Sequence, residues 1–548
     1  MRQYRGSYEI DGSEESALTV RNITYEIVES QISSDIPSPK VDAPSYSLKH
    51  SRAAESVERL LRAVRERLPF DELNDIDERY TYIYGGSIWY IDWENSGGRA
   101  DECGDVKVSC LSPMCFVPQP GILTVEDMEY CFLVFTTTRG ELIRKWGISY
   151  EEADLAECEC EFEGGSSDTD TVKMIVCFYR DEDGEVGRYV FSGDAVLSDI
   201  PRYYMRKSEV CSEEGRALKE IKYETVGADI ILRDGEVIPS ESIRAVGDKA
   251  VIEKTRIPYY VPRDFPIVIR KNTTVEGSLL GGSDPEYIRP EQQAINKVES
   301  RILKKLLRAG ITPIVPEDAN ITLNNSVFGQ VIRMKPGESA AQYGKVDTTP
   351  DISQDIAEAE RLYDHAKRVI GITDAYQGMG FYSAESGVAR QLRISQASGR
   401  LESKKKMKHT AYAAIDRLIF KLYLAFADEP RHLSYKDDYG RIHHEQFNRY
   451  EFVRFDKNTG EYFFDDDYLF KVDLNGGTEY QREALWQRNL ENLNAGTLGD
   501  PASPVTLLRY WQCQERAHYP YARENVEYFS RECEAMGGAG YVKQDENA

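Results

Sequence analysis

The first half of the chain alternates between helical and strand patterns of apolar residues. One apolar stripe at spacings of three and four residues predicts a helix, and it is formed by Val57, Leu60, Leu61, Val64 and Leu68. Residues 21–41 predict a short amphipathic helix, which is stopped by the prolines at 37 and 39. Aromatic and β-branched segments predict strands at 80–86, 87–93 and 129–138, and a hairpin between 171 and 191. This half therefore predicts a mixed α/β region.

The middle of the chain predicts two helices with a small β-rich segment between them. The first begins with Asp284 as its N-cap and Pro285 in its first turn, and Gly310 closes it. Its apolar stripe is Ile288, Ile295, Val298, Ile302 and Leu306. Residues 311–350 hold short β-rich pieces and four prolines, and a second helix returns over 351–371.

A stretch rich in glycine, serine and aromatic residues follows at 373–387 and cannot continue a helix. A long helix is then predicted from Val388 to about residue 427, and strand-like pieces lie within 445–474. The last region predicts a helix that begins at the capping-box pattern of Thr478 and Gln481. A further helix is expected at 503–517, and no internal repeat is visible.

Composition is that of a globular protein: 548 residues, 41% hydrophobic and 29% charged. This length allows several domains or lobes. No segment approaches the ~20 apolar residues that span a bilayer, and the first residues have no apolar signal core. We therefore expect a soluble protein with no membrane partner.

Ten cysteines are too dilute for a disulfide scaffold, and none form a CxxC pair, so reduced and mostly buried thiols are expected. The seven histidines show no spacing typical of metal ligands. Asp465, Asp466 and Asp467 could hold a divalent ion, but their position between two aromatic residues is that of a charged turn. No phosphate-binding glycine loop is present, and nothing marks a nucleophile. The sequence predicts no cofactor, no metal and no catalytic residue.

The formal net charge of −25 argues against ordinary tight DNA binding, which needs lysine and arginine to replace phosphate counterions. Taken alone, it indicates solubility. Two stretches are basic nevertheless: residues 286–310 carry a net +3 and residues 387–410 a net +6.

Several strings, in consistent order over about residues 20–530, resemble the portal proteins of tailed double-stranded DNA phages. GGSDPEYIRPEQQAINKVESRI is similar to the start of that family's first stem helix, and SAESGVARQLR to the exit from its tunnel loop. RNITYEIVESQI and GGSIWYIDW resemble the wing, and NLENLNAGTLG resembles a C-terminal helix-and-turn segment. No single string is decisive, but their order is specific.

The resemblance implies an α+β portal fold with a mixed α/β wing, a two-helix stem, a small β-containing clip, a flexible tunnel loop, a long wing helix and a helical crown. The implied division is: flexible N-terminus 1–20, wing 21–277, first stem helix 278–310, clip 311–350, second stem helix 351–372, tunnel loop 373–387, long wing helix 388–430, wing return strands 431–477, and C-terminal helices, crown and tail 478–548.

The resemblance also implies a function. It predicts a ring of about twelve identical subunits at one capsid vertex of the virion, through which double-stranded DNA is packaged and ejected. The implied partners are the terminase large subunit, a head-completion or tail adaptor protein, and the major capsid and scaffolding proteins. Assembly would take place in the host cytoplasm, and the packaging energy would come from the separate terminase motor.

Two groups of residues are candidates for contact with DNA. The basic candidates, for the channel or for a subunit interface, are Lys297, Arg301, Lys304, Lys305, Arg390, Arg393, Lys404, Lys405 and Lys406. The alternative for each is a solvated helix face or an ion pair between subunits. The tunnel-loop candidates are Tyr376, Gln377, Met379, Phe381, Tyr382, Ser383 and Glu385. They predict a steric guide that reads no base sequence, and the alternative is an ordinary connecting loop.

Other function classes stay open at this point. Another virion structural or adaptor protein would also be acidic, mixed α/β and oligomeric. A nuclease or DNA-modifying enzyme would need converging carboxylates or a metal site. The helix, β segment, returning helix, glycine-rich stretch and long helix, in that order, favour the portal.

Overall fold

The structure is a computed structural model, and it describes the following residues of the chain: 3–6, 19–44, 48–94, 104–149, 171–205, 218–221, 223–226, 229–232, 243–246, 249–252, 255–308, 311–314, 344–347, 351–372, 387–427, 430–436, 442–456, 462–472, 479–501, 503–516, 519 and 522–535. The chain divides into two compact units. The first unit comprises residues 1–32 and 283–402, and the second comprises residues 33–282 and 403–548.

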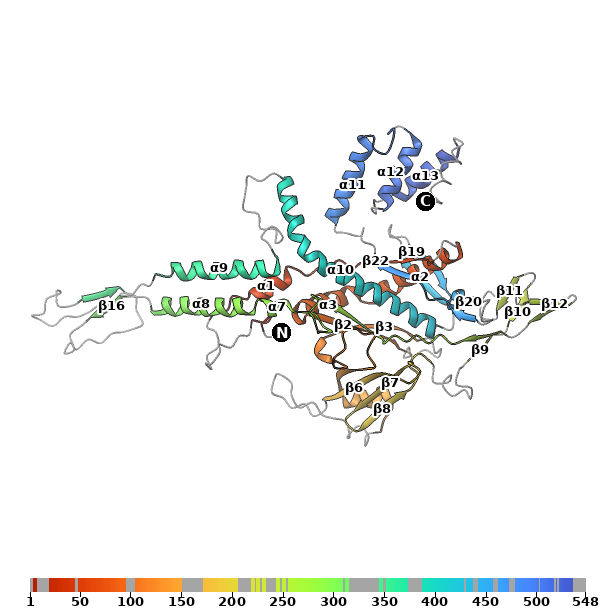
Figure 1. Ribbon diagram of the computed structural model, residues 1–548, viewed down its shortest axis with the longest axis horizontal. Helices are drawn as coiled ribbons and strands as arrows, with labels where there is room; N and C mark the ends of the chain where they lie inside the picture. The colour runs from red at the N-terminus through yellow and green to blue at the C-terminus, as the bar shows by residue number, and fades with distance from the viewer. Residues whose placement is uncertain are drawn as a thin grey trace, which may run out of the picture. The chain divides into compact units, whose positions relative to one another are not determined.

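The first unit is built on two long helices, α8 (Arg289–Arg308) and α9 (Ser353–Ile370), which lie side by side and antiparallel (Figure 1). Beyond their ends, β16 (Ile311–Ile314) pairs antiparallel with β17 (Gly344–Asp347). Helix α9 ends at Gly371, whose φ of 89° is the left-handed conformation that glycine adopts most easily. The predicted sequence of helix, short β segment and returning helix is confirmed for these residues.

Two short helices complete the first unit: α1 (Ile23–Glu29) and α7 (Asp284–Tyr287). α1 is shorter than the helix predicted within 21–41, because it ends at Ser30, well before the prolines. The small apolar core of the unit contains Ile23, Ile27, Ile288, Ile295, Ala366, Ile370 and Ile372.

The start of the first long helix differs from the prediction. Ser283, and not Asp284, is the N-cap, and its hydroxyl accepts a hydrogen bond from the Glu286 amide at 3.3 Å. Asp284 instead lies buried and accepts a hydrogen bond from Gln31 Nε2 at 2.7 Å. The helix is also interrupted at Ile288, which we attribute to Pro290, since its nitrogen cannot donate the helical hydrogen bond.

The second unit contains a three-stranded antiparallel sheet in the order β15-β2-β3. Its strands are β2 (Gly86–Glu94), β3 (Asp105–Leu111) and β15 (Ile267–Lys271). Helices α2 (Leu48–Arg67) and α3 (Phe70–Tyr84) precede the sheet in the chain. The apolar stripe predicted for α2 is confirmed, because Val57, Leu60, Leu61 and Val64 are all buried in the main core.

The strand predicted at 80–86 is wrong for residues 80–84, which form the last turn of α3. Tyrosine, threonine and isoleucine favour strands when only local sequence is considered. In the structure, Thr81, Tyr82 and Ile83 lie in the last turn of α3, and the packing of that helix buries all three. Gly85 ends the helix with a φ of 88°, and a Cβ placed on it would lie 2.2 Å from the Gly281 carbonyl oxygen. Tertiary packing therefore overrides local propensity.

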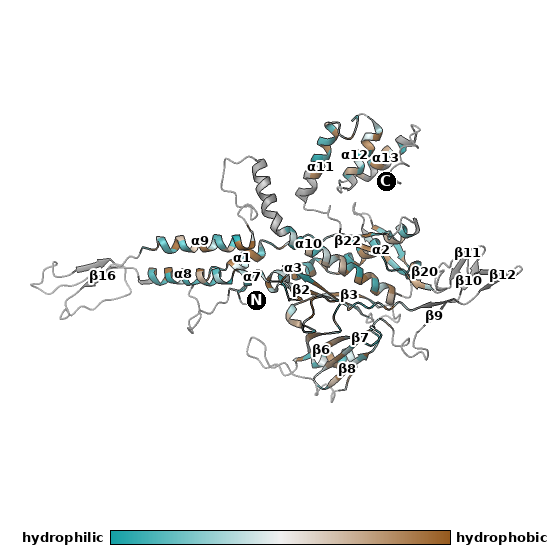
Figure 2. Ribbon diagram, viewed as in Figure 1, coloured by the Kyte–Doolittle hydropathy of each residue, from teal (hydrophilic) through white to brown (hydrophobic). Residues whose placement is uncertain are grey.

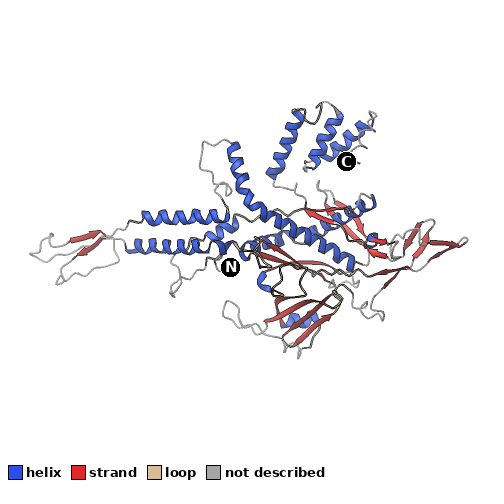
Figure 3. Cartoon of the chain, in the orientation of Figure 1, coloured by secondary structure: helices blue, strands red, loops and turns tan. Residues whose placement is uncertain are grey.

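A five-stranded antiparallel sheet has the order β4-β5-β6-β7-β8 and appears as adjacent red strands in Figure 3. Its strands are β4 (Phe116–Pro118), β5 (Tyr130–Thr138), β6 (Thr171–Arg180), β7 (Val186–Ser192) and β8 (Ala195–Ile200). Helix α4 (Arg139–Trp146) follows β5. The predicted hairpin is confirmed as β6 and β7, and the strand predicted at 129–138 as β5.

The long helix α10 (Gly387–Phe426) confirms the prediction for 388–427. Within the second unit, its last turns are almost wholly buried in the main core. Tyr412 meets Trp89 with ring centroids 5.5 Å apart, and Phe426 meets Trp93 at the same distance. The end of the helix is therefore anchored on strand β2 by aromatic contacts.

The remaining strands of the second unit form antiparallel pairs. They are β9 (Leu218–Ile221) with β14 (Thr255–Pro258), β10 (Tyr223–Val226) with β11 (Asp229–Leu232), β12 (Ile243–Val246) with β13 (Lys249–Ile252), β18 (Arg431–Lys436) with β19 (Ile442–Phe447), β20 (Val453–Phe455) with β21 (Tyr462–Phe464), and β1 (Pro39–Asp42) with β22 (Leu469–Val472). The strand pieces predicted within 445–474 are confirmed in part, because a 3-10 turn at Arg449–Phe452 separates β19 from β20.

The described residues after 478 form the helices α11 (Glu479–Asn494), α12 (Pro504–Arg516) and α13 (Ala522–Ala535). The first two were predicted, and α13 was not. Thr478, the predicted capping residue of α11, lies outside the described residues. Taken together, the elements confirm a mixed α+β chain.

Candidate functional site: a charged helical hairpin and a lysine stretch beside a buried charge cluster

A buried glutamine links the helical hairpin α8–α9 to helix α1. The Gln292 side chain accepts hydrogen bonds from the backbone amides of Ile23 at 2.9 Å and Thr24 at 3.1 Å. These are two of the first amides of α1, which have no partner within their own helix. Gln292 also donates to the Arg21 carbonyl at 2.7 Å and to Asn296 Oδ1 at 3.0 Å. Gln292 thus complements Asn22, the N-cap of α1, in satisfying the first amides of that helix.

Two of the predicted bases on α8 are held by one acid on α9. Arg301 Nη2 lies 3.0 Å from Asp355 Oδ1, and Lys305 donates a hydrogen bond to the other carboxylate oxygen. The hydrogen bond from Lys305 holds the pKa of Asp355 below its ordinary value. Arg301 still has 56% of its side chain exposed, so this pair leaves much of its guanidinium in solvent.

Lys297 and Lys304, the other predicted bases on α8, are exposed. No ion pair to Lys297 is found within the described part of the chain. Hydrophilic and hydrophobic residues alternate along α8 and α9 (Figure 2). The apolar stripe of α8 also fades toward Arg308: Ile295 and Val298 are buried, whereas Leu306 is 49% exposed.

The lysine stretch of α10 divides into exposed and buried members. Lys405 and Lys406 are exposed, and Lys404 Nζ lies 5.0 Å from the centroid of the Tyr82 ring. Lys408 is buried and forms an ion pair with Glu78 Oε1 at 2.9 Å. The side chains of Arg390 and Arg393 lie outside the described residues.

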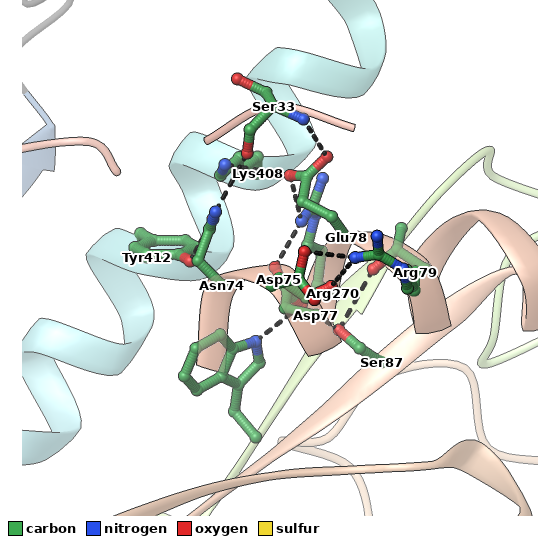
Figure 4. Close-up of polar contacts among 12 residues, drawn as sticks. Ser33, Asn74, Asp75, Asp77, Glu78, Arg79, Ser87, Arg270, Lys408 and Tyr412 are labelled. Carbon is green, nitrogen blue, oxygen red and sulfur yellow. Dashed lines mark hydrogen bonds and ion pairs between the residues drawn. The ribbon is translucent and has the colours of Figure 1, made fainter. Parts of the chain in front are cut away.

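Lys408 belongs to a buried cluster of four charges, in which Lys408, Glu78, Arg270 and Asp77 point toward one another (Figure 4). Arg270 donates to Glu78 Oε1 at 2.9 Å and to Asp77. Trp89 Nε1 also donates to Asp77, at 2.9 Å. Two acids and two bases make the cluster neutral, which is the condition under which buried charges are tolerated.

The cluster joins separate elements of the second unit. Asp77 and Glu78 come from α3, Arg270 from β15 and Lys408 from α10. Burial would raise the pKa of Glu78, but Arg270 and Lys408 overcome that effect and hold it below its ordinary value. Burial lowers the pKa of Lys408 in spite of the attraction of Glu78. The cluster therefore fixes the long helix to the sheet, and the sequence had given Lys408 no such role.

The aspartates at 465–467 do not converge on a common point. Asp465 Oδ2 lies 3.5 Å from His50 Nε2 and 3.6 Å from Arg454 Nε, whereas Asp466 accepts a hydrogen bond from Tyr260 at 2.6 Å. Among the residues that the structure describes, no group of three or more metal-ligating side chains comes together. In the same residues, no helix is both long and apolar enough to cross a bilayer.

The structure describes five cysteines with respect to disulfide bonding. Cys110, Cys115, Cys131, Cys177 and Cys513 form no disulfide. Cys131 is buried, and burial raises its pKa to about 12, whereas the other four are half-buried. The raised pKa keeps the Cys131 thiol protonated, so this thiol is not an activated nucleophile.

A cavity of about 450 Å³ lies between β15, the segment 123–126 and one face of α10. Its lining combines apolar side chains such as Phe265 and Leu418 with charged ones such as Arg180 and Lys421. The Lys421 ammonium is paired with Asp264, so this charge at the cavity already has a partner within the unit.

The comparison with known families decides the identity of the chain. The model of the phage P22-like portal protein family matches residues 43–441, which is 399 of the 548 residues. The chain belongs to this family. No curated protein matches it. It is thus a structural portal protein of a bacteriophage, of the kind found at a capsid vertex and involved in DNA packaging. Membership also implies a ring oligomer.

The portal match spans α2 to β18 and includes the helical hairpin, the β16–β17 pair and the long helix. It leaves out α1 and all three C-terminal helices. All seven tunnel-loop candidates, from Tyr376 to Glu385, lie outside the described residues. Of the basic candidates, the structure brings Arg301 and Lys305 of α8 together at Asp355 of α9.

Proposed function

We propose that this portal protein forms a ring at one capsid vertex that serves as the channel for packaging and ejection of double-stranded DNA. The observation that carries this proposal is the family match over residues 43–441. The two-helix hairpin with a β pair beyond its ends supports it, since a ring of such hairpins would extend a central passage. The net charge of −25 per subunit would keep the duplex from adhering to that passage.

Within the ring, we assign α8 and α9 to the stem, residues 311–350 to the clip and residues 373–387 to the tunnel loop. The wing comprises residues 21–277, the long helix and the strands up to 477, and residues 478–548 form the crown. The clip would contact first the terminase large subunit and then the head-completion or tail adaptor protein. The ring would contain about twelve subunits, assemble in the host cytoplasm and join the major capsid and scaffolding proteins.

The exposed bases are the proposed contacts with DNA or with a neighbouring subunit. Lys405 and Lys406 are the strongest candidates on α10, because both are exposed while Lys408 is already engaged by Glu78. Exchanging Lys404, Lys405 and Lys406 for glutamate should impair ring assembly or packaging. Unchanged assembly together with unchanged packaging would remove these lysines from the function.

The tunnel loop is proposed as a steric guide that hinders backward slippage of DNA. Its glycines allow wide backbone motion, and its aromatic residues supply bulk without positive charge. A variant with the loop shortened should form rings but package or retain less DNA. Particles with normal DNA content would refute this role.

The first experiment is mass photometry and negative-stain electron microscopy of the purified protein. Rings of about twelve subunits with a central hole would support the proposal. A stable monomer or dimer, also in the presence of scaffolding protein, would contradict it. We also propose that the chain has no catalytic activity, and incubation with DNA and magnesium should leave the DNA intact.

A further inference from the structure

One face of α8 carries a ridge of positive charge. Lys297, Arg301 and Lys304 are spaced four and three residues apart, so they share one side of the helix, and all three are exposed. Ile295 and Val298, which pack into the unit, lie on another side. The ridge therefore lies outside the packed face of α8, although Arg301 still reaches Asp355 of α9.

Helix α9 carries a pair of acids on its own exposed side. Glu360 and Asp364 are exposed and four residues apart, which places two like charges next to each other. No ion pair to either residue is found in the described part of the chain. Other charges of α9 are engaged: Arg361 pairs with Glu358 at 2.6 Å, and Lys367 lies 3.9 Å from Glu26. Glu360 and Asp364 thus repel each other, and the exposed base Arg368 lies at helical spacing, four residues after Asp364.

The register of the hairpin sets Lys297 of α8 and Glu360 of α9 at the same height. Near one end Glu291 contacts His365 at 3.0 Å, and near the other Arg301 contacts Asp355 at 3.0 Å. About halfway between these contacts, Lys297 is level with Glu360. Although Lys297 and Glu360 lie at the same height, they form no ion pair with each other within the subunit.

We propose that Lys297 of one subunit faces Glu360 of the next subunit in the ring. This inference rests on the proposed ring and specifies one of its interfaces. Rotation about the ring axis keeps every residue at its own height, so in a ring whose axis runs along the hairpin, residues level within a subunit are level between neighbours. Opposite charges then meet at each of the repeated interfaces, and the like-charge repulsion on each helix is relieved.

The test begins with two charge reversals, Lys297→Glu and Glu360→Lys. Each should raise the protein concentration at which half the chains are in rings by roughly tenfold, because a weak exposed attraction becomes a repulsion of similar size. Mass photometry over a concentration series measures this midpoint. The difference from the wild type should shrink in about 1 M salt, where the Debye length is about 3 Å.

Mixing the two variants supplies the decisive measurement. In a ring that alternates them, the new acid at position 297 of one variant faces the new base at position 360 of the other, and the remaining interfaces keep the natural pair. The mixture should therefore form rings at a concentration close to that of the wild type, although each variant alone does not. Pairing within one subunit would give no such recovery.

A matched control is Arg289→Glu, which changes an exposed base on the same helix outside the ridge. A mixture of Arg289→Glu with Glu360→Lys should keep the assembly defect of the second variant. Thermal unfolding of each variant followed by circular dichroism should match the wild type, since all three positions are exposed.

Four results would overturn the inference. Wild-type rings with unaffected single variants would show that the faces do not meet, and the proposed function would stand. Single variants that assemble poorly and do not recover ring formation when mixed would also show that the two residues do not meet. Normal assembly of Lys297→Glu with lowered DNA content in particles would assign the ridge to DNA instead. Absence of rings from the wild type, even with scaffolding protein, would overturn the proposed function together with this interface.

Discussion

Replacing Arg270 with methionine should destabilise the second unit by about 3–5 kcal/mol, the usual cost of removing one partner from a buried ion pair. Arg270 is 2% exposed, and its guanidinium is the group that contacts both Asp77 and Glu78. Without it, Lys408 alone faces two buried carboxylates, so one negative charge stays uncompensated. Methionine fills much of the same volume, which limits the loss from packing.

The destabilisation should depend on pH. In the wild type the pKa of Glu78 is held below its ordinary value of 4.5, so its contribution to stability is present above that pH and is lost as the pH falls through the folded-state pKa. In Arg270→Met the main attraction that lowers this pKa is gone, and burial then raises it. Protonation on acidification should therefore stabilise the variant, and its deficit relative to the wild type should narrow between about pH 7 and pH 5.

Urea unfolding followed by tryptophan fluorescence, at one fixed protein concentration, measures the free energy of unfolding at each pH. Lys107→Met is the matched control, because the Lys107–Glu94 pair is exposed and should contribute at most about 1 kcal/mol. The double variant Arg270→Met/Asp77→Asn should recover part of the loss. A loss below about 1 kcal/mol, or the same loss at both pH values, would refute the view that electrostatic compensation holds this cluster together.

Three further predictions concern single contacts. Gly85→Ala should destabilise the protein more than Gly121→Ala, because both glycines have a φ above 80° but only the first would place its Cβ 2.2 Å from a carbonyl oxygen; equal losses in urea unfolding would exclude the clash. Gln292→Ala removes the side-chain acceptor that two α1 amides share, at a cost of about 1–3 kcal/mol, and hydrogen exchange should be faster across α1 and little changed in the second unit. In Asp355→Asn the partner of Lys305 is neutral, so this variant should be less stable than the wild type at neutral pH, and the two should converge as the pH falls below the ordinary pKa of 3.8.

The predictable part of the fold is the part in which local pattern and tertiary environment agree. The stripe from Val57 to Val64 has the period of a helix and is buried as one. The hairpin of β6 and β7 follows from two strand-like segments around an acidic turn with one glycine. The turn at 80–84 was misjudged because its residues favour strands locally, whereas burial of Thr81 and Tyr82 in a helix is a long-range effect.

The candidate site shows a similar division. The sequence locates the basic stretches, but only the structure separates Lys408 from the exposed lysines that precede it. A signal was available: Lys408, Tyr412, Ile415 and Ile419 share the spacing of one helical face, and the three apolar members indicate that this face is buried. The acids that neutralise Lys408 and Arg270 could not be inferred, since Glu78 lies 192 residues from Arg270 in the chain.

The chain places charges differently on different helices, and this difference bears on assembly. On α2, opposite charges are spaced four apart and pair within the helix, as in Arg59–Glu55 and Arg62–Glu58. On α8 and α9, in contrast, Lys297–Arg301 and Glu360–Asp364 place like charges at that spacing, beside the Arg361–Glu358 pair of α9. Repulsion between these like charges destabilises the free subunit, and contact with opposite charges relieves the repulsion. Because Lys297 and Glu360 are opposite in sign and level in height, the natural source of the opposite charge is another copy of the same chain. Weak exposed pairs repeated around a ring then make assembly cooperative and sensitive to salt.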